Sequence, residues 1–294
     1  MATEPIRPHP AHASSSFRRG LSDAPAGPMR VCTWNIHAWG DAAGRSRVDD
    51  VIAVLRTVDA DVVVLNEVLS PGGALLRVAQ ALDKDVFYGP AAFGGNAVLA
   101  PRGSVAQSVA LVVPGGEARN AVVVDVGATG ISVVGVHLDD RHEVVRCAQL
   151  RTLFESIKGL GPHVVAGDLN AVDPEDQPPA RRAEIEAARA RHRLEPSMND
   201  VVTMLRDAGY LDAARAGGQR GPLPEALQRT CWAGTRVDHV WLDARLAPRA
   251  TVVSVEVVET DASDHQPVVV TIDVGARSWS TSSATEPAQP ESKT

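Results

Sequence analysis

The chain has 294 residues, of which 44% are hydrophobic and 22% are charged. These fractions are typical of a globular protein and exclude a collagen-like, coiled-coil or largely disordered chain. Its 36 acidic residues outnumber the 29 basic ones, which gives a net charge of −7. Proteins that wrap nucleic acid without sequence preference are usually basic, so this balance disfavours that class.

The cysteines and termini bear on the cellular compartment. The three cysteines, Cys32, Cys147 and Cys231, share no metal-finger spacing, and we expect no disulfide framework. The sequence shows neither a signal-peptide pattern nor an apolar run near the roughly 18 residues of a membrane span. We therefore expect a cytoplasmic protein without a transmembrane segment, acting as a monomer.

Composition divides the chain into three parts. Residues 1–28 and 277–294 are rich in proline, serine and threonine and have no hydrophobic periodicity. Such segments cannot bury enough apolar surface to fold, so we expect two disordered tails. The sequence predicts one domain over residues 29–276.

Short β-branched runs recur through this domain and predict strands. In chain order they cover residues 30–36, 62–65, 97–100, 105–113, 121–126, 131–138, 163–166, 237–242, 251–258 and 268–272. Helical spacing of apolar residues predicts helices over 48–58, 74–82, 144–157 and 201–208. Because the strands between 97 and 138 have no helix between them, a plain parallel sheet is excluded. We expect an α/β fold of two packed sheets with helices outside.

Polar residues repeatedly stand at the ends of these strands. They are Asn35, Glu67, His137, Asp168 with Asn170, Asp238, and the pair Asp264 and His265 just before the last strand. Strand ends are where sheet proteins gather ligand-binding groups. The pattern predicts one polar site built from distant segments.

Each of these residues also has a structural interpretation. Glu67 is a potential helix cap, and Asp168 with Asn170 is compatible with an ordinary Asx turn. A single histidine such as His137 is more often a hydrogen-bonded core residue than a ligand. The order and conjunction of the segments favour the functional interpretation.

Seven short motifs occur in the order of one known family. They are Thr33-Trp34-Asn35, Asn66-Glu67, Gly94-Gly95-Asn96, Val136-His137-Leu138, Gly167-Asp168-Leu169-Asn170, Arg236-Val237-Asp238 and Ser263-Asp264-His265. Together they resemble the endonuclease/exonuclease/phosphatase superfamily of metal-dependent phosphoesterases over residues 30 to 272. The resemblance implies a four-layer α/β sandwich of two mixed sheets.

The resemblance also implies a divalent cation. Carboxylate and amide oxygens suit Mg²⁺, which needs only one or two protein carboxylates because it keeps several waters. Glu67 is the first expected metal ligand, with Asn35 and Asp264 contributing directly or through water. We expect Mg²⁺, with Mn²⁺ as the alternative ion.

The family implies a catalytic role for the remaining site residues. Asp168 is expected to activate the attacking water, and Asn170 to hold the phosphate. His265 is expected to donate to a non-bridging oxygen, with Asp238 keeping it protonated. His137 is expected to bind the phosphate or assist the leaving group.

The sequence departs from the abasic-endonuclease pattern at two positions. His37 stands where those enzymes carry an acidic residue, and Asn66 replaces the commoner glutamine before Glu67. The first change removes an auxiliary ligand and favours a single metal ion. Both weaken any assignment of abasic DNA as the substrate.

Two further features bear on nucleic acid. The arginine-rich segment Arg181 to Arg193 is either a phosphate-binding patch or the solvated face of a helix. Trp39 and Trp232 lie in predicted loops and are candidates for stacking on a base.

Three functions follow from these observations. We favour a Mg²⁺-dependent phosphodiesterase that uses direct attack of water on a phosphoester of unspecified type. The alternative is an endo- or exonuclease that holds DNA or RNA through Arg181–Arg193. The third is a catalytically silent binding module with the same fold.

Overall fold

The computed structural model describes residues 27–274, apart from 42, 70, 71, 92, 93, 115 and 128. The predicted tails 1–28 and 277–294 lie outside the described residues, except for residues 27 and 28. Within the described part, no helix combines the length and apolar character needed to span a bilayer.

Two six-stranded mixed sheets form the centre of the domain. The first has the order β11-β12-β1-β2-β4-β3. Its strands are β1 (Met29–Asn35), β2 (Val62–Val68), β3 (Asp85–Gly89), β4 (Gly95–Ala100), β11 (Thr251–Val257) and β12 (Val268–Asp273). In this sheet β1 pairs in parallel with β2 and antiparallel with β12.

The second sheet has the order β5-β6-β7-β8-β10-β9. Its strands are β5 (Val105–Leu111), β6 (Arg119–Val126), β7 (Ile131–His137), β8 (His163–Asp168), β9 (Leu211–Asp212) and β10 (Asp238–Leu242). Here β7 pairs in parallel with β8, whereas β10 runs antiparallel to β8.

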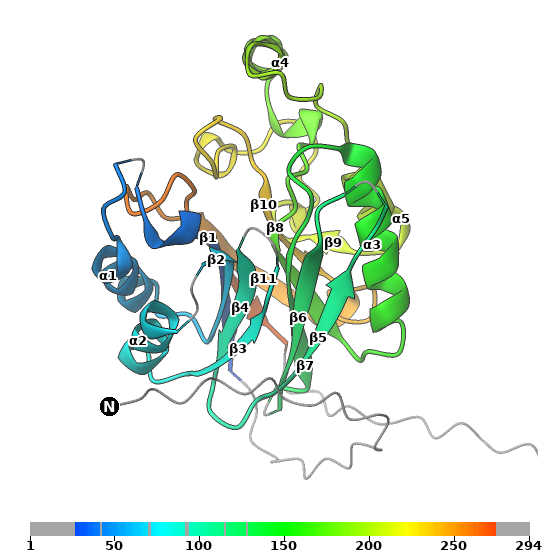
Figure 1. The fold of residues 1–294 in the computed structure, drawn as a ribbon. Helices are drawn as coiled ribbons and strands as arrows, with labels where there is room; N and C mark the ends of the chain where they lie inside the picture. The colour runs from blue at the N-terminus through cyan, green and yellow to red at the C-terminus, as the bar shows by residue number, and fades with distance from the viewer. Residues whose placement is uncertain are drawn as a thin grey trace, which may run out of the picture.

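Helices cover the outer faces of both sheets, which makes four layers (Figure 1). Helices α1 (Val48–Val58) and α2 (Gly73–Ala81) lie outside the first sheet, and α3 (Glu143–Ile157) and α5 (Asp200–Asp207) outside the second. Helix α4 (Pro179–Arg191) stands apart above the sheets. In α1, Val51 and Leu55 are four positions apart and therefore face the core together.

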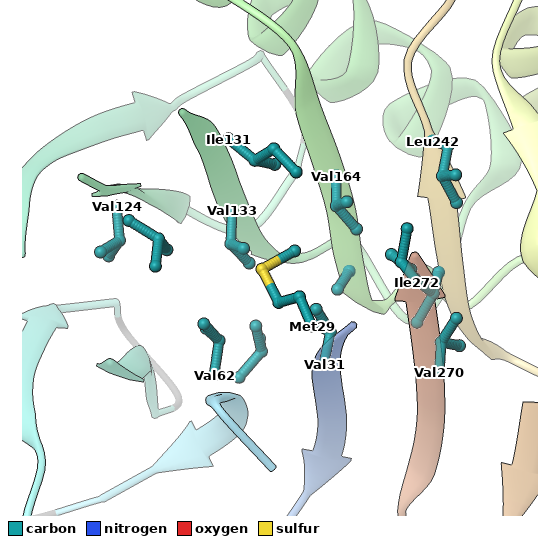
Figure 2. Close-up of a cluster of buried hydrophobic side chains, with 14 of the residues drawn as sticks. Met29, Val31, Val62, Val124, Ile131, Val133, Val164, Leu242, Val270 and Ile272 are labelled. Atoms are coloured by element: carbon teal, nitrogen blue, oxygen red, sulfur yellow. The ribbon is translucent and has the colours of Figure 1, made fainter. Parts of the chain in front are cut away.

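The core between the two sheets is built almost wholly of aliphatic side chains (Figure 2). Val31 and Val62 of the first sheet pack toward Val133 and Val164 of the second, and all four are fully buried. Alternate residues of each strand therefore face inward, while their neighbours face the helices. Burial of these valines is the main force that holds the sheets together.

The predicted fold is confirmed, and all the predicted strands and helices are present, with ends that agree within about three residues. Two strands and one α-helix were missed, as were the short 3-10 helices. Strand β3 is only half-buried and has little alternation, and β9 has just two residues. Helix α4 buries only Ile185, so its sequence lacks a broad apolar stripe.

Strand direction brings the polar residues to one edge of the sandwich. Strands β1, β2, β7 and β8 all end at this edge, where Asn35, Glu67, His137 and Asp168 lie. Antiparallel β10 begins here with Asp238, and the segment before β12 returns to the end of β1. Residues from both sheets therefore meet at one place.

Candidate active site

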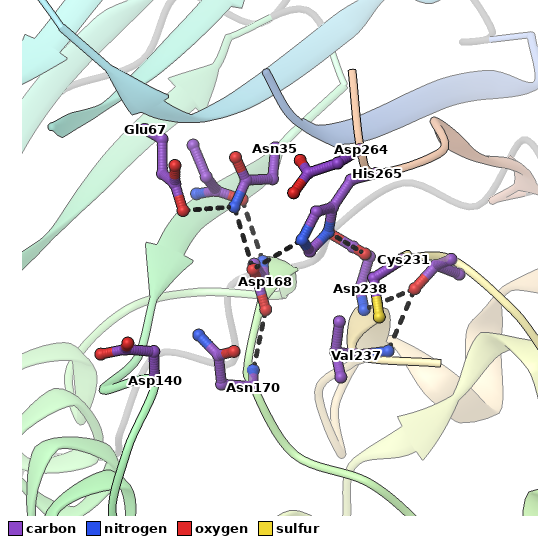
Figure 3. A network of polar contacts seen from close by, with 12 residues as sticks. Asn35, Glu67, Asp140, Asp168, Asn170, Cys231, Val237, Asp238, Asp264 and His265 are labelled. Atoms are coloured by element: carbon purple, nitrogen blue, oxygen red, sulfur yellow. Dashed lines mark hydrogen bonds and ion pairs between the residues drawn. The ribbon is translucent and has the colours of Figure 1, made fainter. Parts of the chain in front are cut away.

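Asp168, Asp238 and His265 form the centre of the site (Figure 3). Asp238 of β10 is the register partner of Asp168 of β8. The imidazole of His265 lies between the two carboxylates, with Nδ1 2.9 Å from Asp238 Oδ2 and Nε2 3.9 Å from Asp168 Oδ2. Each side chain is at most 10% exposed.

The surroundings set the protonation of this group. Burial, together with the negative charge of Asp238, raises the pKa of Asp168 to about 7. Burial alone would lower the pKa of His265, but the Asp238 carboxylate outweighs it and holds that pKa well above the usual range. The site therefore pairs a carboxyl group that titrates near neutrality with a protonated imidazole.

Asn35 and Glu67 lie on the side of Asp168 that belongs to the first sheet. Asn35 Nδ2 donates to Glu67 Oε1 at 2.9 Å and to Asp168 Oδ2 at 3.1 Å. The amide oxygen of Asn35 accepts from the backbone N–H of His37 at 3.1 Å. In this orientation Asn35 holds the two carboxylates in place, while its oxygen is engaged with the backbone.

Glu67 stands at an irregularity of β2, where the register with β4 shifts between Leu65 and Val68. Its φ is +56°, a conformation that glutamate rarely adopts. Gly94 lies against it, since a Cβ on Gly94 would be 2.9 Å from the Glu67 Cα. A glycine is therefore required beside the Glu67 backbone.

Asp264 reaches the same side of the site from the segment before β12. Ser263 Oγ donates to the Asn35 carbonyl at 2.8 Å and so anchors this segment to the end of β1. The Asp264 carboxylate is 2.9 Å from His37 Nδ1. His37, which departs from the family pattern, is thus in direct contact with one expected metal ligand.

His137 and Asn170 lie on the opposite side of Asp168. Arg119 Nη1, which can only donate, is 3.2 Å from His137 Nδ1. Burial, reinforced by the charge of Arg119, holds the pKa of His137 well below its usual value. His137 is therefore a neutral imidazole whose Nε2 is 3.7 Å from Asp168 Oδ2.

Asn170 is held by the turn that follows β8. Its backbone N–H donates to Asp168 Oδ1 at 2.9 Å, which is an Asx turn. Its side-chain nitrogen lies 3.1 Å from His137 Nε2 and donates to the Leu138 carbonyl at 3.2 Å. The Asx-turn interpretation and the functional one are compatible at this position.

A chain of three buried amides links the two sheets beneath the site. Asn66 of β2 accepts from the Asp168 backbone N–H at 2.9 Å and donates to Asn96 of β4 at 2.7 Å. Asn96 in turn donates to the Asn120 carbonyl of β6 at 2.6 Å. Asn66, which replaces the commoner glutamine, therefore ties the backbone of Asp168 to the opposite sheet.

A buried ion-pair network supports the site from below. Arg236 is 2.8 Å from Asp176 and 2.7 Å from Asp212, and all three side chains are at most 4% exposed. Because Arg236 stands two residues before Asp238, these ion pairs fix the start of β10. The loop after Asn170 is held to β10 by the same contacts.

One geometric cluster among the described residues also suits a metal ion. A potential ligand atom from each of Asp168, Asp238 and His265 lies within 4.8 Å of the others. His265 Nδ1 is, however, already bonded to Asp238, which favours a proton-holding pair over a set of ligands. The acidic oxygens of Glu67 and Asp264 lie outside this cluster and suit a hard cation.

The structure brings together every predicted site residue, and one contributor was missed. Arg119, buried at the start of β6, contacts His137 and also lies 2.9 Å from Glu117. The one indication in the sequence was that a charged residue, Arg119, begins a strand that is mostly apolar. Nothing else in the sequence linked this arginine to the site.

The arginine segment and the two tryptophans, which were candidates for nucleic-acid binding, differ in their accessibility. Within the arginine segment, Arg181 pairs with Glu184 and Arg189 donates to the Glu195 carbonyl, so the segment is not one continuous basic face. Trp39 is only 6% exposed and bonds to the Leu69 carbonyl, so it is not available for stacking. Trp232 is 59% exposed and remains a candidate.

The chain is an α/β sandwich of two mixed sheets with a His–Asp pair at the strand ends. Residues 32–265 match the family described as Endonuclease/Exonuclease/phosphatase. The chain therefore belongs to the endonuclease/exonuclease/phosphatase family. Its members are in general hydrolytic phosphoesterases, so membership supports a phosphoesterase or nuclease.

Solved structures of this family have the same fold. A protein described as an endonuclease/exonuclease/phosphatase from Beutenbergia cavernae DSM 12333 is 26% identical, with a TM-score of 0.63 over 85% of this chain and 72% of that one. The human Nocturnin catalytic domain with bound sulfate is 19% identical, with a TM-score of 0.61 over 84% of this chain and 93% of that one.

A third similar structure is D. rerio TDP2 complexed with a single-strand DNA product. It is 18% identical, with a TM-score of 0.61 over 83% of this chain and 98% of that one. At this level of identity the likeness concerns the fold. The comparison with curated proteins gave no match.

Proposed function

We propose that this chain is a Mg²⁺-dependent phosphodiesterase in which a water activated by Asp168 attacks phosphorus directly. The observation that carries the proposal is the position of Asp168. Its carboxylate is bonded to Asn35 on one side and lies 3.9 Å from the His265 imidazole on the other. A base and a protonated donor thus lie side by side at one strand end.

The oxygen donors on the side of the first sheet suit a hard divalent cation. Glu67 would hold the ion, with Asp264 and Asn35 helping directly or through water. Asn35 supports the ion best through its hold on Glu67, because its own oxygen accepts from His37. When bound, the cation would neutralise charge on the phosphoester and polarise a phosphoryl oxygen.

The residues on the other side would bind the phosphate and manage protons. Asp168 would take a proton from the attacking water as the oxygen–phosphorus bond forms and the ester bond breaks. Protonated His265 would donate to a non-bridging oxygen as negative charge builds there. Asn170 and the neutral His137 would hold the phosphate, and His137 can also assist the departing oxygen.

The direct test is hydrolysis of bis(p-nitrophenyl) phosphate with and without Mg²⁺. We expect turnover that stops on chelation and resumes with Mg²⁺ or Mn²⁺. Glu67→Gln should raise the Mg²⁺ concentration needed for half-maximal rate, while Glu256→Gln, on exposed β11, should not. Metal-independent turnover, or an unchanged metal requirement in Glu67→Gln, would contradict the proposal.

A nuclease is the second candidate because of Trp232. This side chain is 59% exposed and contacts His192 edge-to-face with ring centroids 5.3 Å apart. It follows Cys231, which forms a β-bridge with His265, so an exposed aromatic ring stands near the site. Exposed rings of this kind stack on bases in proteins that bind single strands.

Plasmid nicking separates the two candidates. Magnesium-started nicking of supercoiled DNA that is lost in His265→Gln and weakened in Trp232→Ala would favour the nuclease. Hydrolysis of the small diester without nicking would favour a small-molecule or lipid phosphodiester as substrate. No metal-dependent hydrolysis of any phosphoester would favour a silent binding module.

A further inference from the structure

A cavity lies outside the candidate active site. Its volume is about 560 Å³, and none of its lining residues belongs to the site. Four of these residues are arginines from three separate elements, and one is glutamate. They are Arg182 in the first turn of α4, Arg206 at the end of α5, Arg215 in the 3-10 helix Ala213–Arg215, Arg220 in the following loop, and Glu175.

Two of the arginines are fixed by buried carboxylates. Arg206 Nη2 is 2.6 Å from Asp173, and Arg215 Nη2 is 2.6 Å from Asp176. Both aspartates are at most 2% exposed, and Asp176 is shared with the buried Arg236. The two guanidinium groups are therefore held in position without a ligand, which lowers the entropic cost of binding one.

The loop after Arg215 is built around this side chain. Arg215 Nη1 donates to the Gly221 carbonyl at 2.9 Å, and the side chain is only 10% exposed. Its Nε is buried and has no partner among the described residues. Arg215 therefore places a fixed positive charge in the wall of the cavity.

The other two arginines keep free donors. Arg182 donates through Nε to the Gln177 carbonyl at 2.9 Å, and Arg220 is exposed in its loop. Like charges brought together in this way repel one another. Glu175 is the acidic side chain of the lining and offsets only part of that repulsion.

We propose that this cavity binds the phosphate groups of a small polyanionic ligand, at a site separate from the reacting phosphoester. Planar guanidinium groups match phosphate oxygens in pairs, and the volume is in the range of small-ligand pockets. A polynucleotide would need a basic track that leads away from the cavity. Of the neighbouring arginines of α4, Arg181 pairs with the Glu184 carboxylate and Arg189 donates to the Glu195 backbone carbonyl, which interrupts such a track.

The test is isothermal titration of the full chain with inorganic pyrophosphate in metal-depleted, phosphate-free buffer. The double variant Arg182→Gln with Arg220→Gln should bind at least about tenfold more weakly, since charge-assisted hydrogen bonds are lost. The matched control is Arg191→Gln with Arg193→Gln, which removes the same charge from exposed positions and should leave the affinity unchanged. Glu175→Gln should bind more tightly than the wild type.

The outcomes are distinct from those of the hydrolysis assay, because binding is measured without metal or turnover. Absence of pyrophosphate binding, or equal weakening in both double variants, would overturn the proposal. Binding of a short single-stranded oligonucleotide, but not of pyrophosphate, in an Arg182- and Arg220-dependent way would assign the cavity to nucleic acid instead. Melting curves of each variant verify that the fold is intact.

Discussion

Asp168 and Asp238 are paired residues on adjacent antiparallel strands, and His265 lies against both carboxylates. The two aspartates are nevertheless placed differently. Asp238 is bonded to the imidazole Nδ1, whereas Asp168 accepts from the Asn170 backbone and the Asn35 amide. Replacing one carboxylate is therefore expected to have a different effect from replacing the other.

Asp168→Asn should lower the rate of phosphodiester hydrolysis by about 10²- to 10⁴-fold, the usual contribution of a general base. The asparagine keeps the size of the side chain, so the fold should persist. Asp207→Asn, at an exposed position of α5, is the control for loss of one carboxylate. A near-wild-type rate in Asp168→Asn would remove Asp168 from the mechanism.

The same substitution should change the pH dependence of stability. The pKa of Asp168 is raised to about 7, so the folded state keeps a proton that the unfolded state loses near pH 4. Stability from this group therefore falls as pH rises from about 4 to about 7 and is then constant. Asp168→Asn lacks this loss. The free energy of unfolding of the variant should therefore increase relative to that of the wild type as the pH rises from about 4 to about 7.

Urea denaturation of the metal-free proteins at several pH values measures this difference. The difference between the two proteins reports Asp168 together with its effect on neighbouring His265, whose pKa the Asp168 charge helps to raise, whereas His239 titrates in both. The pKa of buried His239 is lowered to about 4, and it contributes a slope of the opposite sign. A constant difference between the two proteins from pH 4 to 7 would contradict the raised pKa.

Gly94→Ala should displace Glu67. A Cβ on Gly94 would lie 2.9 Å from the Glu67 Cα, whereas a Cβ on Gly103 meets nothing within 4 Å. Both glycines have positive φ, +97° and +82°, so both alanine variants share the backbone strain. Only Gly94→Ala should lose activity, by up to about 100-fold, because small displacements of catalytic groups are costly.

Hydrolysis rates measured beside melting temperatures separate strain from displacement. The melting temperatures of the two alanine variants should fall to a comparable degree. The hydrolysis rate should fall more in Gly94→Ala. Equal activity in both would mean that the Glu67 position does not depend on Gly94.

Arg236→Met should destabilise the domain by about 3–5 kcal/mol, since it leaves buried Asp212 without its ion-pair partner and removes one of the two arginines that pair with Asp176. Asp176 and Asp212 both depend on this guanidinium. Arg102→Met removes an exposed ion pair with Asp83 and should cost less than about 1 kcal/mol. Urea unfolding at pH 7 measures both, and similar values for the two variants would contradict a structural role for the network.

The predictable part of this molecule depends on two periodicities. Apolar runs defined the strands of the interior, and i, i+3, i+4 spacing defined helices such as α1. Half-buried β3, two-residue β9 and exposed α4 lack those patterns, because few of their side chains enter the core. Elements that bury little surface leave little trace in the sequence.

The clustering of the candidate residues was predictable because most of them stand at strand ends, which meet at one edge of the sheets, and because their order resembled that of a known family. Arg119 escaped prediction because its contact with His137 depends on the register between β6 and β7, which no local pattern specifies. The burial of Trp39 was missed for a similar reason. Its partner, the Leu69 carbonyl, is 30 residues away in the sequence.

The amide chain from Asn66 through Asn96 to Asn120 has a mechanical consequence. Packing of valine on valine has no preferred direction, so the apolar core alone would let one sheet slide over the other at little cost. Hydrogen bonds are directional and fail within a fraction of an ångström of such sliding. The hydrogen bonds of the three asparagines therefore fix the position of one sheet relative to the other. They keep the half of the site on β1 and β2 aligned with the half on β7 and β8.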